Sequence, residues 1–310
     1  MTLAVAAFVA FAVGIAWSIG APFVIPRGSS PVTGTEPLTP FLVTLVVYGA
    51  VRFARAFRPC SPAFDRDALE LIAMDLLLIG LFGIVVYVHF HLKMWVPLVN
   101  DRSFDATFFA IDESLRPVIE GMRTARAAIS MMLPRTDVWY DLAFFAMFAL
   151  AFWSHSLGPR RWLFHNMVGI TLVEVLGPLL YLAAPACGPF LFEIGDNARA
   201  SLAQQEMYAS YSALQDGGLT WMDVHGPAYF TAPLAAMPSL HLAAAFVLAY
   251  YAVRARFWIA PFAVLVAAWI ALEAVVSRWH YLVDLPVGLL VAFIAIALAN
   301  RLCRFRLRDA

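Results

Sequence analysis

Apolar runs close to membrane-spanning length recur along almost the whole chain, and this feature constrains the fold more than any other. A helix needs roughly 20 mostly apolar residues to cross the hydrocarbon core of a bilayer. Of the 310 residues, 62% are hydrophobic and only 14% are charged, which is too little charge to cover the surface of a soluble domain of this size. Lipid is therefore the predicted solvent for most of the chain.

Backbone groups inside lipid must form their hydrogen bonds within the protein, so only helices and closed barrels span membranes. The apolar runs are continuous, whereas barrel strands alternate apolar and polar residues. The sequence thus predicts an all-α, polytopic transmembrane bundle of about eight spans. We expect residues 1–60 to supply two extra helices and residues 61–310 to form a catalytic domain around six helices. The expected spans are 3–24, 38–55, 69–92, 138–157, 166–185, 239–254, 257–276 and 281–302.

Two long segments, 93–137 and 186–237, are mixed in polarity and are not simple turns. In the first, aromatic residues such as Phe104 and Phe108 are interspersed with Asp105, Asp112 and Arg116. That spacing predicts an amphipathic helix in the plane of the membrane interface. In the second, the aromatic residues are of the kind that favours the headgroup level: Tyr208, Tyr211 and Trp221.

Arginines in the short connections predict the orientation of the bundle. They cluster at 52–66, 160–161, 254–256 and 301–308, and eight spans place all four clusters on one side. The positive-inside rule makes that side cytoplasmic, so both termini are expected there and both long segments face outward. Lys93 is the only lysine, a bias that indicates a GC-rich, bacterial genome and hence the inner membrane. The net charge is zero and no basic tract indicates a nucleic-acid partner.

The first motif that carries chemistry is Met237-Pro238-Ser239-Leu240-His241, at the outward start of a span. Proline suits the first turn of a helix, where its missing N–H costs nothing. Ser239 is a candidate helix cap or phosphate ligand. His241 then lies within the first helical turn. A single histidine at a helix end is more often an ordinary interfacial residue, so this motif alone is weak.

The second motif, Ser277-Arg278-Trp279-His280-Tyr281-Leu282-Val283-Asp284, leads into the last span on the same side. His280 and Asp284 are four residues apart and share one helix face. A carboxylate beside an imidazole fixes its tautomer and stabilises its cation. Two helix N-termini at one place favour an anion such as phosphate, and Arg278 adds a forked donor for phosphate oxygens. Both motifs on one face predict a phosphoryl-transfer site with two histidines.

Pro238-Ser239-Leu240-His241, His280-Tyr281, Asp284 and Gly288 resemble the type 2 phosphatidic acid phosphatase superfamily of integral membrane enzymes. Within it, the sequence is most similar to the inositol phosphorylceramide synthase-like branch of lipid phosphotransferases. The resemblance implies that His280 is the nucleophile, that Asp284 orients it and that His241 acts as acid and then base. It also implies that Ser239 and Arg278 hold the phosphate, and that no metal or other cofactor is needed.

The chain departs from the phosphatases of this superfamily, because it lacks their upstream lysine–arginine–proline motif. This departure and the histidine–tyrosine form favour a transferase, with a phospholipid or lipid phosphate as donor and a lipid or polyol hydroxyl as acceptor. A lipid phosphate phosphatase is the first alternative. A lipid transporter without catalysis and a zinc hydrolase using His241, His280 and Asp284 are the others. Four outward arginines are candidates to complete the phosphate clamp, although headgroup-facing charges are the favoured interpretation: Arg116, Arg123, Arg126 and Arg135.

Several other polar residues fall in or beside predicted spans. Asp75, Glu174 and Glu273 are expected to form hydrogen bonds between helices, although Glu273 precedes His280 by seven residues and could instead support the site. His89 and its neighbour His91 are expected at the membrane interface.

Overall fold

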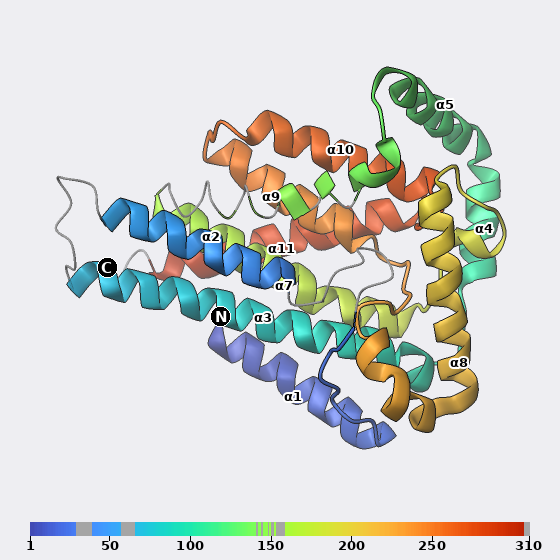
Figure 1. Cartoon of the computed structure of the whole chain (residues 1–310), viewed down its shortest axis with the longest axis horizontal. Helices are drawn as coiled ribbons and strands as arrows, with labels where there is room; N and C mark the ends of the chain where they lie inside the picture. The colour runs from blue at the N-terminus through green and yellow to red at the C-terminus, as the bar shows by residue number, and fades with distance from the viewer. Residues whose placement is uncertain are drawn as a thin grey trace.

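The chain folds into helices, as the computed structural model shows (Figure 1). It describes residues 1–28, 39–56, 66–140, 142–143, 145–147, 149, 152 and 159–306, and all regular structure in these ranges is helical. The prediction of an all-α fold is confirmed. The helices are α1 (Thr2–Ile19), α2 (Thr39–Ala56), α3 (Arg66–Val99), α4 (Asp105–Ser114), α5 (Arg116–Met132), α7 (Arg160–Ala183), α8 (Ala198–Tyr229), α9 (Leu240–Arg254), α10 (Ala260–Val276) and α11 (Asp284–Arg306), with short 3-10 turns η1 (Thr136–Val138) and η2 (Pro189–Leu191).

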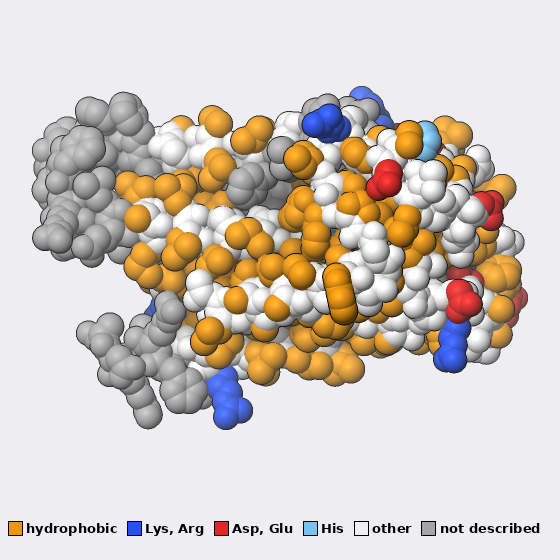
Figure 2. Space-filling model, turned by 90° about the horizontal axis from the view of Figure 1, so that it is seen from below, with side chains coloured by type: hydrophobic (Ala, Val, Ile, Leu, Met, Phe, Trp, Pro, Cys, Tyr) orange, Lys and Arg blue, Asp and Glu red, His pale blue; other side chains and the backbone are white. Residues whose placement is uncertain are grey.

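Four of the described helices are long and apolar enough to cross a bilayer: Thr2–Ile19, Ile72–Val99, Arg161–Ala183 and Asp284–Cys303. The helices α9 and α10 are apolar but shorter. Figure 2 shows hydrophobic side chains spread over the body of one face, with few charged side chains among them. This distribution supports a membrane protein. The number of spans stays a prediction, and the expected span at 138–157 lies largely outside the described residues.

The helix α9 is the centre of the bundle and packs against α7, α10 and α11. Its alanines Ala243, Ala244 and Ala245 are fully buried. Small side chains let helix backbones approach closely, which is how membrane helices pack in the absence of a hydrophobic driving force. On the outside of this group, α3 packs against α7, and α1 packs against α3.

Three helices, α4, α5 and α8, gather at one end of the bundle (Figure 1). Local sequence explains their ends. Pro117 lies in the first turn of α5, and the Asn197 side chain accepts a hydrogen bond from Ala200 N–H at the start of α8. Gly218 breaks the helical path of α8 with a φ of 56°.

The helix predicted around residues 104–116 exists as α4, and its position in the membrane interface stays a prediction. Asp105 and Asp112 are buried, with 4% and 0% of their surfaces exposed. Seven residues apart, they lie on the same face of α4 two turns from each other. That face is turned to the protein, where hydrogen-bond donors compensate the two carboxylates.

Candidate functional site

The starts of α9 and α11 are in direct contact. Ser239 N–H donates to the carbonyl of Asp284, with N and O 3.2 Å apart. A Cβ on Gly288 would come within 2.4 Å of the Ser239 carbonyl oxygen, so only glycine permits this approach. The two predicted motifs therefore meet at one end of the bundle, as the arginine distribution predicted from sequence.

His280 and Asp284 form the expected pair. Nδ1 of His280 lies 3.2 Å from Oδ2 of Asp284, and the Tyr281 N–H donates to the same oxygen at 2.9 Å. Because a carboxylate only accepts hydrogen bonds, Nδ1 carries the proton and Nε2 is the nitrogen with a lone pair. Both side chains are buried, and Oδ1 of Asp284 has no hydrogen-bond partner among the described residues.

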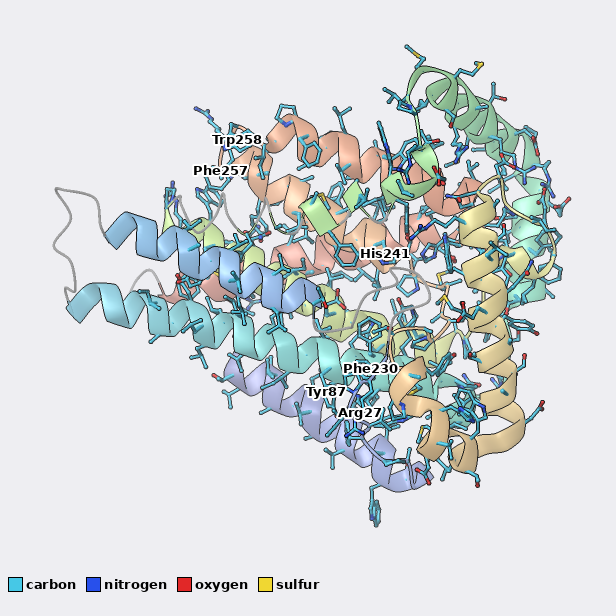
Figure 3. All side chains as sticks on the ribbon, in the orientation of Figure 1. Arg27, Tyr87, Phe230, His241, Phe257 and Trp258 are labelled. Carbon is cyan, nitrogen blue, oxygen red and sulfur yellow. The ribbon has the colours of Figure 1, made fainter. Side chains whose placement is uncertain are left out.

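His241 lies in the first turn of α9 and is labelled in Figure 3. Its Nδ1 is 2.9 Å from Oη of Tyr140, and the two rings are nearly perpendicular. It is close enough to His280 for the two imidazoles to interact electrostatically. Unlike His280 and Asp284, which are buried, His241 is exposed.

Ser239 precedes the first turn of α9, where it occupies the N-cap position. It is completely buried, yet its side chain accepts no capping hydrogen bond, and Oγ has no partner among the described residues. A buried hydroxyl without a partner is unfavourable. The free N–H groups of a helix start lie beside it, so an anion bound there would satisfy both.

Arg278 is also completely buried, and its charge is already compensated. Nη1 lies 3.2 Å from Oδ2 of Asp112, and Nη2 lies 2.9 Å from Oε2 of Glu193. Burial lowers the pKa of Arg278, and the two carboxylates oppose this shift. Its Nε has no hydrogen-bond partner among the described residues. The predicted phosphate clamp is therefore an arginine held between two carboxylates, whose Nε still has a donor to offer.

Arg116, Arg123 and Arg126 form ion pairs with carboxylates of the protein, and whether they also face headgroups stays a prediction. Arg116 and Arg123 form ion pairs with Glu193 at 2.8 and 2.9 Å. Arg126 Nε lies 3.2 Å from Oε2 of the fully buried Glu273. The arginines of α5 thus face the protein and attach this helix to α10 and to the segment after η2. Arg135, the fourth, is exposed.

Glu273 supports the segment that carries His280, which was one of its two predicted roles. Its Oε1 accepts hydrogen bonds from Ser277 Oγ at 2.6 Å and from Asn197 Nδ2 at 2.8 Å. The other expected helix–helix bonds are present: Asp75 accepts from Tyr48 at 2.8 Å, and Glu174 of α7 lies 3.0 Å from His89 of α3.

The sequence motifs did not identify Tyr140, Asp105, Asp112 or Lys93 as neighbours of the site. Lys93 and His89 are close enough to His241 to affect it electrostatically. His89 is buried beside Glu174 and His91 is buried as well, while their predicted depth at the membrane interface stays a prediction. The sequence held a signal for the proximity of Lys93 to His89, because these two residues are one helical turn apart and share a face of α3.

Among the described residues, no group of three or more His, Cys, Asp and Glu side chains is arranged to hold a metal ion. The described geometry instead offers two imidazoles, a carboxylate, an unpartnered hydroxyl and two helix starts. Fold and site together describe a helical protein with apolar, membrane-length helices and with these groups gathered at one end of its bundle.

Comparison with known protein families matches residues 110–298 to the PAP2 superfamily. The match covers more than half of the chain and includes every predicted site residue, so the chain belongs to the PAP2 superfamily. Members of this superfamily are generally phosphatases or phosphotransferases, and membership together with the apolar helices fits a membrane enzyme acting on lipid phosphates. Searches of curated proteins and of solved structures give no match.

Proposed function

We propose that this protein is a lipid phosphotransferase that moves a phosphoryl group, or a phosphoryl headgroup, through a covalent bond to His280. The observation that supports this most is the contact between the starts of α9 and α11, where Ser239 N–H donates to the Asp284 carbonyl at 3.2 Å. It brings His241 and the His280–Asp284 pair to two adjacent helix N-termini, which favour a bound phosphate.

In the first step, Nε2 of His280 attacks phosphorus, a P–N bond forms, and the P–O bond to the leaving lipid alkoxide breaks. His241 gives its proton to that alkoxide. In the second step, the acceptor hydroxyl gives its proton to His241 while its oxygen attacks phosphorus, so the P–N bond breaks and His280 is regenerated. Asp284 stabilises the positive charge that forms on His280. Ser239 Oγ and the helix N–H groups stabilise the charge on the phosphate oxygens, and no metal or other cofactor takes part.

The balance of charge favours a phosphodiester donor such as a glycerophospholipid. A phosphomonoester carries close to two negative charges near neutral pH, and a phosphodiester carries one. Arg278 is already paired with Asp112 and Glu193, and Arg126 with Glu273. A site with so little uncompensated positive charge suits the singly charged substrate. This supports the inositol phosphorylceramide synthase-like branch, with a lipid or polyol hydroxyl as acceptor.

The lipid phosphate phosphatase is the second candidate because His241 is exposed. Water that reaches this histidine could replace the lipid acceptor in the second step. The two activities share the first step and differ only in the nucleophile of the second.

We further propose that the site faces the exterior side of a bacterial inner membrane, with both termini in the cytoplasm. The helix directions support this. Arg160 begins α7 and Arg254 ends α9, so both lie at the end opposite the site, and Arg301, near the end of α11, also lies there. Cysteine labelling from either side of intact cells would test the orientation.

Mass spectrometry of lipids after incubation of the purified protein with mixed phospholipids tests the activity. A new phosphodiester lipid indicates a transferase, and free phosphate indicates a phosphatase. His280→Ala should abolish either product. His165→Ala is the matched control, because His165 lies near the start of α7 at the opposite end, and it should keep wild-type turnover. Unchanged turnover in His280→Ala, or activity that depends on stoichiometric zinc, would contradict the proposed mechanism.

A further inference from the structure

Two buried carboxylates of α4, Asp105 and Asp112, both make hydrogen bonds with the segment that carries His280. Asp112 accepts a hydrogen bond from Leu282 N–H at 2.8 Å and from Nη1 of Arg278 at 3.2 Å. These two partners lie two residues before and two residues after His280. Burial raises the pKa of Asp112, and its two donors oppose that shift.

Asp105 contacts the same segment one residue away from His280. Its Oδ1 accepts from Oη of Tyr281 at 2.7 Å, and it also accepts from the backbone N–H groups of Cys187 and Gly188, both at 2.9 Å to Oδ1. The Tyr281 N–H donates to Asp284 Oδ2, the oxygen that also contacts His280. Asp105 is therefore linked through one tyrosine to the carboxylate that orients the nucleophile.

The segment from 277 to 283 has no helical hydrogen-bond ladder of its own. It also contains Arg278 in the left-handed region, at a φ of 59°, which is unfavourable for a residue with a side chain. An irregular segment of this kind keeps one conformation only when its surroundings determine it. Phosphoryl transfer in turn requires the attacking nitrogen to be placed to within a fraction of an ångström.

We propose that Asp105 and Asp112 are positioning residues, and that α4 acts as a clamp that fixes His280 in its reactive geometry. The clamp acts through three neighbours of His280, namely Arg278, Tyr281 and Leu282, and neither carboxylate touches the substrate. This inference rests on the proposed role of His280 as nucleophile. It gives α4 a function in the reaction in addition to its place at the end of the bundle.

Asp112→Ala removes the hydrogen bonds to Arg278 and Leu282. Asp112→Asn keeps an acceptor for Leu282 N–H but loses the charge beside Arg278. Tyr281→Phe removes the hydroxyl that donates to Asp105. We expect kcat to fall at least tenfold in Asp112→Ala and by less in the other two, while KM changes less than threefold. The apparent pKa in the pH profile of kcat should also move, because the His280–Asp284 pair is no longer held. Asp101→Asn, an exposed carboxylate close to α4, is the matched control and should behave as wild type.

Hydrogen exchange distinguishes this proposal from the proposed function. Amides at 278–283 should exchange faster in Asp112→Ala than in the wild type, while amides of α9 stay protected. If the variant only lowers the folded fraction, kcat per active site and the pH profile stay unchanged, which overturns the positioning role. Wild-type exchange at 278–283 overturns the clamp. If the wild-type protein turns over no phospholipid, the proposed function is overturned. Hydrogen exchange at 278–283 then still tests whether Asp112 holds this segment.

Discussion

Gly288→Ala tests the helix contact on which the site depends. The added Cβ would lie 2.4 Å from the Ser239 carbonyl oxygen, and real Cβ contacts are essentially never below 3.0 Å. The starts of α9 and α11 must therefore separate, because the obstacle is backbone and not a flexible side chain. Overpacking of this kind costs about 1–3 kcal/mol. A displacement of about 1 Å at a reacting centre costs on the order of 100-fold in rate.

We expect Gly288→Ala to lower the free energy of unfolding by about 1–3 kcal/mol and kcat by roughly 10- to 100-fold. Initial rates with mixed phospholipids in liposomes give kcat, and thermal unfolding in detergent gives the stability. The matched control is Gly80→Ala in α3, where a Cβ would meet nothing within 4 Å. The control should keep its activity and gain up to about 1 kcal/mol of helix stability. If Gly288→Ala keeps wild-type kcat, the contact does not organise the site and the reasoning is refuted.

Three further changes test other parts of the structure. Asp284→Asn removes the charge that orients His280, so kcat should fall by roughly 10²–10⁴-fold, and an initial rate within threefold of wild type would contradict this role. Burial raises the pKa of Glu193, but the surrounding arginines outweigh it, and the pKa lies below its ordinary value of 4.5. The stability that Glu193 contributes is therefore complete above pH 4.5 and is lost as the pH falls through its pKa in the folded protein. Glu193→Gln should make the free energy of unfolding fall less steeply at acid pH, and an unchanged acid dependence would argue against this role. Arg126→Met leaves the Glu273 carboxylate buried without its cation and should cost about 3–5 kcal/mol; adding Glu273→Gln should recover part of this in thermal unfolding, and a further loss would rule out the pairing.

The sequence was sufficient to predict the helical class, the meeting of the two motifs at one end of the bundle and the His280–Asp284 pair. Each depends on local or simply periodic information. Apolar runs identify membrane helices because lipid leaves so few alternatives, and an (i, i+4) spacing fixes which side chains share a face. The contact of Ser239 with Asp284 was predictable in outline, because both residues begin helices on the same side.

The environment of Arg278 could not be predicted in the same way. Its partners Asp112 and Glu193 are distant in sequence, and an acidic residue on an amphipathic helix has the same local pattern whether it faces water or a buried arginine. The same ambiguity hid the partners of the arginines of α5, which pair with carboxylates of the protein. Only the three-dimensional arrangement shows which charges are paired, and hence how little positive charge is left for the substrate.

The most direct test of the mechanism is to trap the covalent intermediate. The purified protein is incubated with a phospholipid labelled at phosphorus in the absence of acceptor, quenched in alkali, digested and mapped. We predict an acid-labile, base-stable label on His280, absent from His280→Ala and present in His165→Ala. Label on a different residue, or steady turnover without any phosphorus bound to the protein, would contradict the mechanism.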